Sequence, residues 1–124
     1  MFVRGIRGAT TVKANTEQEI IKETIAMLDE IVAQNNLSPE DIASLLITVT
    51  DDITATFPAK AIRQMKSWEL VPLMCALEIP VPGSLELCIR MLVTVNTTKS
   101  QSEINHVYMN EATRLRPDLK PTAG

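Results

Sequence analysis

Two segments of the chain carry apolar residues on both faces of the strands that they are expected to form. They are residues 44–50, which read SLLITVT, and residues 86–96, which read ELCIRMLVTVN. Successive side chains of a strand point to opposite faces of its sheet, so such a strand needs apolar cover on both sides. Any fold for this chain must therefore bury both faces of a central sheet.

Two helices are predicted beside these strands. Thr16 and Glu19 have the spacing of a capping box, and they start a helix that runs to about Asn35. The apolar residues that recur at helical spacing in it are Ile21, Ile25, Leu28 and Val32. A second helix is predicted to begin at Pro58, in the segment FPAKAIRQM. Between the two helices, the SPED segment at 38–41 predicts a short turn or helix.

The order of the elements predicts the fold class. Further strands are predicted at residues 2–12, 70–79 and 104–109, with a turn at 81–84 and an irregular tail from 114. The resulting order, β-α-β-α-β-β-β, predicts a single α+β domain over residues 1–124, with a mixed β-sheet and two main helices on one face. Two helices cover about one face of the sheet, so we expect further subunits to cover the other.

Composition narrows the possible partners and the compartment. A net charge of −3 and an aromatic content of 3% disfavour nucleic acid, which requires a basic surface and stacking platforms. No apolar segment is long enough to span a membrane, and the first residues do not resemble a secretion signal. Two cysteines, Cys75 and Cys88, make no disulfide framework, so a cytoplasmic location is expected.

The groups that serve metal, nucleotide and covalent chemistry are missing from the sequence. His106 is the single histidine, and it lies in a short apolar strand, where a structural role is expected. Cys75 and Cys88 are expected to pack among apolar residues, because no base accompanies them. There are no paired metal ligands, no glycine-rich phosphate loop and no dinucleotide fingerprint. The sequence therefore predicts neither a metal nor a cofactor.

Positive charges recur among the apolar residues. They belong to Arg4, Arg7, Lys60, Arg63, Arg90 and Arg116. Lys60 and Arg63 are three residues apart, which also fits a solvated helix face. Arg90 is more constrained, because it lies inside CIRMLVTV and a buried arginine needs an opposite charge. That charge belongs either to the protein, as Glu78 or Glu86, or to a ligand.

Several cations without a nucleophile predict a site for a small polyanion. Such a site either binds the anion without changing it, or catalyses a reaction that needs only positioning and electrostatics. The residues alone leave both possibilities open.

Six ordered fragments of the chain resemble one enzyme family. They are IRGATTV at 6–12, FPAKA at 57–61, VP at 71–72 followed by Cys75 and Glu78, CIR at 88–90, HVY at 106–108 and LRPDL at 115–119. The set resembles the small monofunctional chorismate mutases of the trimeric α+β class over residues 2–119. The resemblance implies a homotrimer with a pseudo-α/β-barrel-like centre and active sites in clefts between subunits. It also implies conversion of chorismate to prephenate, in phenylalanine and tyrosine biosynthesis, without cofactor or metal.

The same resemblance implies five catalytic residues. Arg90 would donate a hydrogen bond to the ether oxygen of the breaking bond, and Arg7 would contact other substrate oxygens. Glu78 would accept a hydrogen bond from the ring hydroxyl, with Cys75 beside that hydroxyl. Tyr108 would donate to a substrate carboxylate.

Eight further residues would bind the substrate by resemblance. They are Phe57, Ala59, Lys60, Arg63, Leu73, Met74, Leu115 and Arg116. The first three would line the cleft from the neighbouring subunit, the two arginines would be cations at its mouth, and Leu115 would belong to a flap. Leu73 and Met74 stand where smaller or hydroxyl-bearing residues are common in the family, so a different local pocket shape is expected.

The residues and the resemblance agree on the chemistry. Chorismate is a dianion, so its site needs several cations, and its rearrangement occurs within one molecule, so no nucleophile is required. Negative charge grows on the ether oxygen as the C–O bond breaks, and a fixed guanidinium stabilises that charge most in the transition state. The alternatives are a non-catalytic trimeric binding module for a small polyanion and an unrelated trimeric deaminase on a similar fold. The CIR and LRPDL segments argue against the deaminase.

Overall fold

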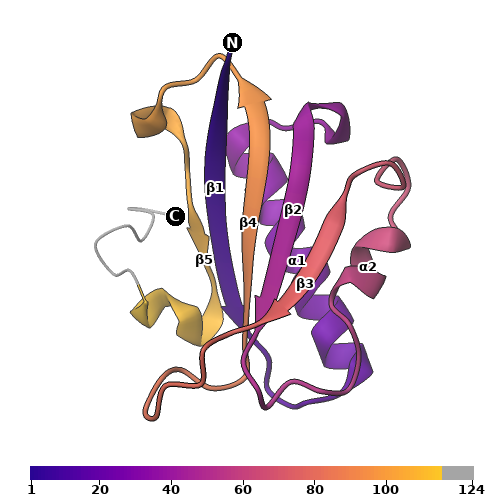
Figure 1. The fold of residues 1–124 in the computed structure, drawn as a ribbon, viewed down its shortest axis with the longest axis vertical. Helices are drawn as coiled ribbons and strands as arrows, with labels where there is room; N and C mark the ends of the chain where they lie inside the picture. The colour runs from indigo at the N-terminus through magenta and orange to yellow at the C-terminus, as the bar shows by residue number, and fades with distance from the viewer. Residues whose placement is uncertain (116–124) are drawn as a thin grey trace.

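The computed structural model describes residues 1–115, whose centre is one mixed five-stranded sheet (Figure 1). The strands are β1 (Phe2–Thr11), β2 (Ile42–Val49), β3 (Leu73–Leu77), β4 (Cys88–Thr97) and β5 (Val107–Tyr108), in the spatial order β3-β2-β4-β1-β5. Strand β4 runs antiparallel to both β1 and β2, whereas the edge strands β3 and β5 are parallel to their neighbours. The predicted mixed sheet is therefore confirmed.

Two α-helices accompany the sheet. Helix α1 (Glu17–Asn35) lies across its back, and helix α2 (Ala59–Arg63) lies beyond the β3 edge (Figure 1). The hydroxyl of Thr16 accepts a hydrogen bond from the Glu19 N–H at 3.2 Å, so the predicted helix start is confirmed. Short 3-10 turns follow at η1 (Pro39–Asp41), η2 (Gln101–Glu103) and η3 (Asn110–Arg114). In the described part of the chain, neither helix is long and apolar enough to cross a bilayer.

Several predicted boundaries differ from the structure. The strand predicted at 86–96 begins at Cys88, because Leu87 has a φ of 50°, in the left-handed region that a strand does not contain. The strand predicted at 70–79 is shortened to 73–77, after Pro72. The last strand has only two residues, and the helix predicted from Pro58 has only five. The turn η3 was not predicted at all.

The helix face predicted from apolar spacing is confirmed at Leu28, which is buried, and at Val32, which packs against the core, but the centre of the buried face is shifted by about one position. The residues of α1 that are buried are Ile20, Thr24, Met27, Leu28, Ile31 and Asn35. Polar Thr24 belongs to this face because its hydroxyl donates to the Ile20 carbonyl at 2.7 Å, which satisfies it inside the core. The helix also packs closely against Gly8, because a Cβ atom added at this glycine would lie only 2.6 Å from the Ile31 Cδ1 atom. A pattern of apolar residues alone does not contain these two contacts.

The C-terminus of α1 is tied to the segment that leads into β5. The side-chain amide of Asn35 donates to the Asn105 carbonyl at 2.8 Å and accepts from the Asn105 N–H at 2.8 Å. The Nδ1 atom of His106 accepts a hydrogen bond from the Arg7 N–H at 2.9 Å. The structural role predicted for this histidine is confirmed, and the contacts together fix where Tyr108 enters the sheet.

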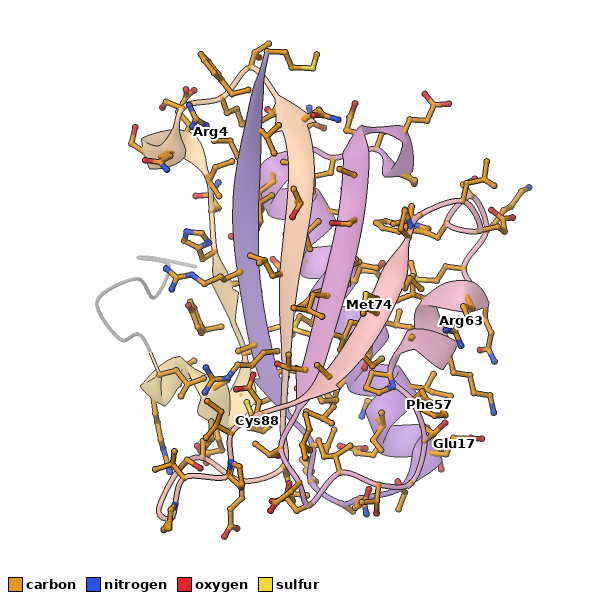
Figure 2. The ribbon with its side chains drawn as sticks, in the orientation of Figure 1. Arg4, Glu17, Phe57, Arg63, Met74 and Cys88 are labelled. Atoms are coloured by element: carbon orange, nitrogen blue, oxygen red, sulfur yellow. The ribbon has the colours of Figure 1, made fainter. Side chains whose placement is uncertain are left out.

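The face of the sheet opposite α1 is open in the single chain. Its exposed apolar side chains include Leu46, Met74 and Leu92, which are 38%, 71% and 42% exposed. Met74 stands on edge strand β3 (Figure 2). The sequence predicted that the helices would leave one face without cover, and that face carries the candidate site.

Candidate active site

A cavity of about 330 Å³ lies on the open face of the sheet. Its walls are formed by Arg7, Gly8, Ala9, Leu46, Thr48, Glu78, Arg90, Met91, Leu92, Tyr108 and Leu115. Five of the thirteen predicted site residues, Arg7, Glu78, Arg90, Tyr108 and Leu115, are thus brought together. The volume is at the lower end of the range for sites that bind small molecules.

Strand register explains why these residues meet. In the antiparallel pairs, Ala9 of β1 and Thr48 of β2 both lie directly opposite Arg90 of β4. Tyr108 is in turn the neighbour of Ala9 across the parallel β1–β5 pair. The N–H of Glu78 donates to the Val49 carbonyl at 2.8 Å, so the chain stays against β2 just beyond the end of β3. Five short segments therefore present side chains to one spot.

Arg90 is paired with Glu78 but is not buried in the single chain. The Nε atom of Arg90 lies 3.8 Å from the Glu78 Oε2 atom, and the side chains are 44% and 26% exposed. The distance is too long for a hydrogen bond, and a guanidinium has five N–H donors to offer. Of the two acids predicted as partners, Glu78 is the one in contact. The contact with Glu78 therefore uses none of these donors in a hydrogen bond, and Arg90 also lines the cavity.

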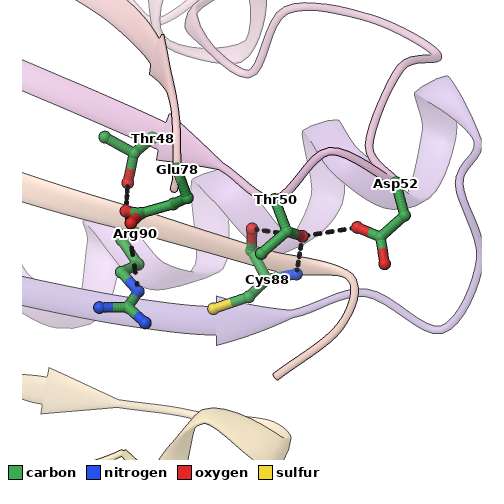
Figure 3. A network of polar contacts seen from close by, with 6 residues as sticks. All are labelled: Thr48, Thr50, Asp52, Glu78, Cys88 and Arg90. Atoms are coloured by element: carbon green, nitrogen blue, oxygen red, sulfur yellow. Dashed lines mark hydrogen bonds and ion pairs between the residues drawn. The ribbon is translucent and has the colours of Figure 1, made fainter. Parts of the chain in front are cut away.

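A hydroxyl group holds the Glu78 carboxylate on its other side. The Oγ1 atom of Thr48 donates a hydrogen bond to the Oε2 atom of Glu78 (Figure 3). Thr48 was missed by the sequence analysis. The signal that could have found it is a polar residue inside the apolar run SLLITVT, on the opposite strand face from buried Ile47.

A second polar network fixes the start of β4. The Thr50 hydroxyl donates to Asp52 at 2.5 Å and accepts from the Cys88 N–H at 2.9 Å (Figure 3). Asp52 also accepts a hydrogen bond from the Leu87 N–H at 2.9 Å. These bonds stabilise the left-handed conformation of Leu87, which lies three residues before Arg90. Thr50 and Asp52 were also missed, because their role depends on a contact across 35 residues or more.

The two cysteines lie in different environments, and both are free. Cys88 is fully buried, and this burial raises the pKa of its thiol, an effect that the nearby Arg90 guanidinium partly opposes. A thiol with a raised pKa is protonated at neutral pH and is a poor nucleophile, as expected for a packing residue. Cys75 is half-buried and packs against the main core, outside the cavity that Arg90 lines.

The other predicted site residues lie away from Arg90 in the single chain. Phe57 and Cys75 line a separate cavity of about 500 Å³, and Arg63 and Leu73 line another of about 230 Å³. Ala59 is buried, and Met74 is exposed on the open face. Phe57 and Arg63 gather with Glu17 around α2, beyond the β3 edge (Figure 2). Arg116 lies outside the described residues.

Lys60 also lies away from Arg90 in the single chain. Its Nζ atom lies 2.9 Å from the Glu17 Oε2 atom, and the hydrogen bond from Lys60 lowers the pKa of the Glu17 carboxyl. Both side chains are about half exposed, as expected for a solvated helix face. Within one chain, five predicted site residues therefore line the cavity of Arg90, and a second group of seven, on or near α2 and β3, does not.

The cavity can recognise a small anion that also carries a hydroxyl group. Arg7 and Arg90 supply positive charge, Glu78 supplies an acceptor, and Tyr108 supplies a phenol, among apolar walls that include Leu92. Within residues 1–115, no group of three or more histidine, cysteine or acidic side chains is placed to hold a metal ion.

Comparison with known proteins identifies close relatives over nearly the whole length. Residues 3–119 match the family described as chorismate mutase type I. The chorismate mutase AroH of Bacillus subtilis is 46% identical over 122 residues, which cover 98% of this chain and 96% of that protein. The chorismate mutase AroH of Thermus thermophilus is 47% identical over 120 residues, which cover 96% of this chain and 98% of that protein. The solved structure of a chorismate mutase from Clostridium thermocellum superimposes with a TM-score of 0.87 at 50% identity, covering 90% of this chain and 98% of that one.

Proposed function

The chain belongs to the type I chorismate mutase family, and from this premise we propose how its open-face cavity converts chorismate to prephenate. The reaction is an isomerisation that supplies phenylalanine and tyrosine biosynthesis. The ether C–O bond breaks and a C–C bond forms within the same molecule, so atoms and electrons balance without a co-reactant. The observation that carries the proposal is Arg90, set on the open sheet face with Glu78 as its one carboxylate partner among the described residues.

Arg90 acts on the charge that develops at the ether oxygen. Cleavage of the C–O bond runs ahead of C–C bond formation, so the oxygen becomes more negative in the transition state than in chorismate. A guanidinium N–H aimed at this oxygen stabilises the transition state more than the bound substrate, which is the requirement for acceleration. The fixed strand position of Arg90 and the attraction of Glu78 place the positive charge before the reaction, so little reorganisation is needed.

The remaining side chains of the cavity orient the substrate. Arg7 contacts substrate oxygens, and the Tyr108 hydroxyl donates a hydrogen bond to a substrate carboxylate. Glu78 accepts a hydrogen bond from the ring hydroxyl, and Leu115 closes over the cavity as part of a flap. Holding a flexible molecule in a reactive conformation lowers the entropic part of the barrier.

The second group of residues reaches the site from a neighbouring chain of a homotrimer with a barrel-like centre. Its members are Phe57, Ala59, Lys60, Arg63, Leu73, Met74 and Cys75. Exposed apolar residues on the open face, such as Met74 at 71%, support this assembly, because a second chain would bury them. Cys75 lines a separate cavity with Phe57 in its own chain, which supports its contribution to a site of the neighbouring chain. The mouth position of Arg116 and the cytoplasmic location stay predictions.

Purified protein alone should convert chorismate to prephenate, and excess EDTA should leave the rate unchanged. The reason is that the proposed chemistry rests on fixed side chains and uses no metal. Loss of chorismate absorbance, with prephenate identified as product, measures this directly. Absence of turnover at micromolar protein would favour the passive polyanion-binding module, and strong inhibition by the chelator would contradict the metal-free mechanism.

Glu78→Gln should lower kcat/KM by roughly ten- to a hundred-fold, because a hydrogen bond to a charged group contributes about 1.5–3 kcal/mol. The substitution keeps the shape of the side chain but removes the charge that faces both Arg90 and the ring hydroxyl. We expect weaker binding and slower turnover together in steady-state kinetics. A variant with nearly wild-type kinetics would show that Glu78 does not contact the substrate.

A further inference from the structure

Resting on the proposed function, we propose that Thr48 is a positioning residue that orients the Glu78 carboxylate and so sets the preference for a substrate with a ring hydroxyl. Thr48 lies on the central part of β2, with Ala76 of β3 beside it on one side and Arg90 of β4 on the other. It is therefore the residue of β2 that stands between the strand leading to Glu78 and the strand carrying Arg90.

Glu78 needs such a partner because little else restrains its side chain. Its backbone is held by the hydrogen bond to Val49, but the side chain has several rotatable bonds and leaves the sheet just after β3 ends. The 3.8 Å contact with Arg90 is an ion pair without hydrogen-bond geometry, so it attracts the carboxylate without fixing its rotation. The Thr48 hydroxyl supplies the directional bond, and its own rotation is restricted by the β-branch.

The geometry divides the two carboxylate oxygens between two tasks. The Oε2 atom accepts from Thr48 and is also the atom nearest the Arg90 Nε atom. The Oε1 atom has no hydrogen-bond partner among residues 1–115 and is available to a ligand in the cavity. A carboxylate accepts at both oxygens, so a substrate hydroxyl can bind at Oε1 while Thr48 holds Oε2.

Thr48→Val tests the proposal, because valine has the same branched shape and strand preference but no hydroxyl. We expect kcat/KM for chorismate to fall about ten-fold, mainly through a higher KM, since the hydroxyl contact exists in bound substrate as well as in the transition state. Thr48→Ser is the matched control and should stay within about two-fold of the wild type, because it keeps the donor. With a chorismate analogue that lacks the ring hydroxyl, Thr48→Val and the wild type should react at similar rates.

A double-mutant cycle separates an effect through Glu78 from a packing effect. In the Glu78→Gln background, Thr48→Val should cause little further loss, because its target has already been altered. Thermal unfolding checks that each variant is folded, and Thr48→Ala replaces the valine variant if that one does not fold. Wild-type protein that fails to turn over chorismate would count against the proposed function itself. Given an active wild type, the positioning role is overturned if Thr48→Val has the same kcat/KM as the wild type, or if Thr48→Ser is as impaired as Thr48→Val. It is also overturned if the losses caused by Thr48→Val and Glu78→Gln simply add in the double variant.

Discussion

Arg90→Ala should lower kcat by at least about a hundred-fold while KM changes by less than about ten-fold, because loss of one preorganised donor to a developing oxyanion costs about 3–4 kcal/mol. The side chain lies opposite Thr48 and Ala9 on the open face, where it can meet a substrate. Its charge acts mainly on an oxygen that becomes negative during bond cleavage. The loss should therefore fall on the chemical step, and steady-state kinetics of the purified variant will show it.

Two further measurements distinguish this role from a structural ion pair. Arg90→Lys keeps the charge but loses the planar donor geometry, so it should remain strongly impaired. In the single chain the Arg90–Glu78 pair is partly exposed, and exposed pairs contribute only about 0–1 kcal/mol, so the melting temperature of Arg90→Ala should change little. If Arg90→Ala instead unfolds at much lower temperature while each folded molecule keeps its activity, Arg90 is a structural residue.

Mixed assembly of two impaired variants should restore activity. Arg90→Ala should be weakly active alone because it loses transition-state stabilisation. Lys60→Ala should be weakly active alone because it loses a group that anchors the substrate. In one chain Lys60 pairs with Glu17 beside α2, outside the cavity of Arg90, so we propose that the two residues of a site come from different chains. When both variants are unfolded, mixed equally and refolded, about a quarter of the sites in a ring should contain two native halves.

The matched control mixes two variants that damage the same half of the site. Arg7→Ala and Arg90→Ala both alter the cavity of one chain, so no arrangement of their trimers contains an intact site and activity should not rise. The refolded samples should run at about 41 kDa, three times the 13.7 kDa chain. If Arg90→Ala with Lys60→Ala stays at the mean of the two parents, the residues do not belong to complementary halves on different chains.

The sequence predicted the parts of the fold that depend on local patterns. The capping signal at Thr16 marked the start of α1, and the apolar runs marked the central strands β2 and β4. It also predicted an uncovered sheet face from the shortage of helices. Arg90 stood out in the sequence because a charge in an apolar strand requires an explanation, and the structure places it in the cavity of that face.

Features that depend on contacts between residues far apart in the chain could not be predicted from the sequence. The buried face of α1 is set partly by the missing side chain of Gly8, and its polar member Thr24 satisfies itself within the helix. Thr48 reaches Glu78 across 30 residues, and only the pairing of β2 with β3 brings them together. The separation of Lys60 from Arg90 within one chain likewise follows from the strand order.

Single-turnover kinetics of the wild type and Arg90→Ala test most directly whether Arg90 stabilises the transition state. With enzyme in excess over chorismate, the plateau rate constant reports the chemical step and the half-saturating enzyme concentration reports binding, whereas KM mixes the two. We expect the plateau to fall at least about a hundred-fold and the half-saturating concentration to change by less than about ten-fold. An unchanged plateau with a greatly raised half-saturating concentration would show that Arg90 only anchors the substrate, and would contradict the proposed mechanism.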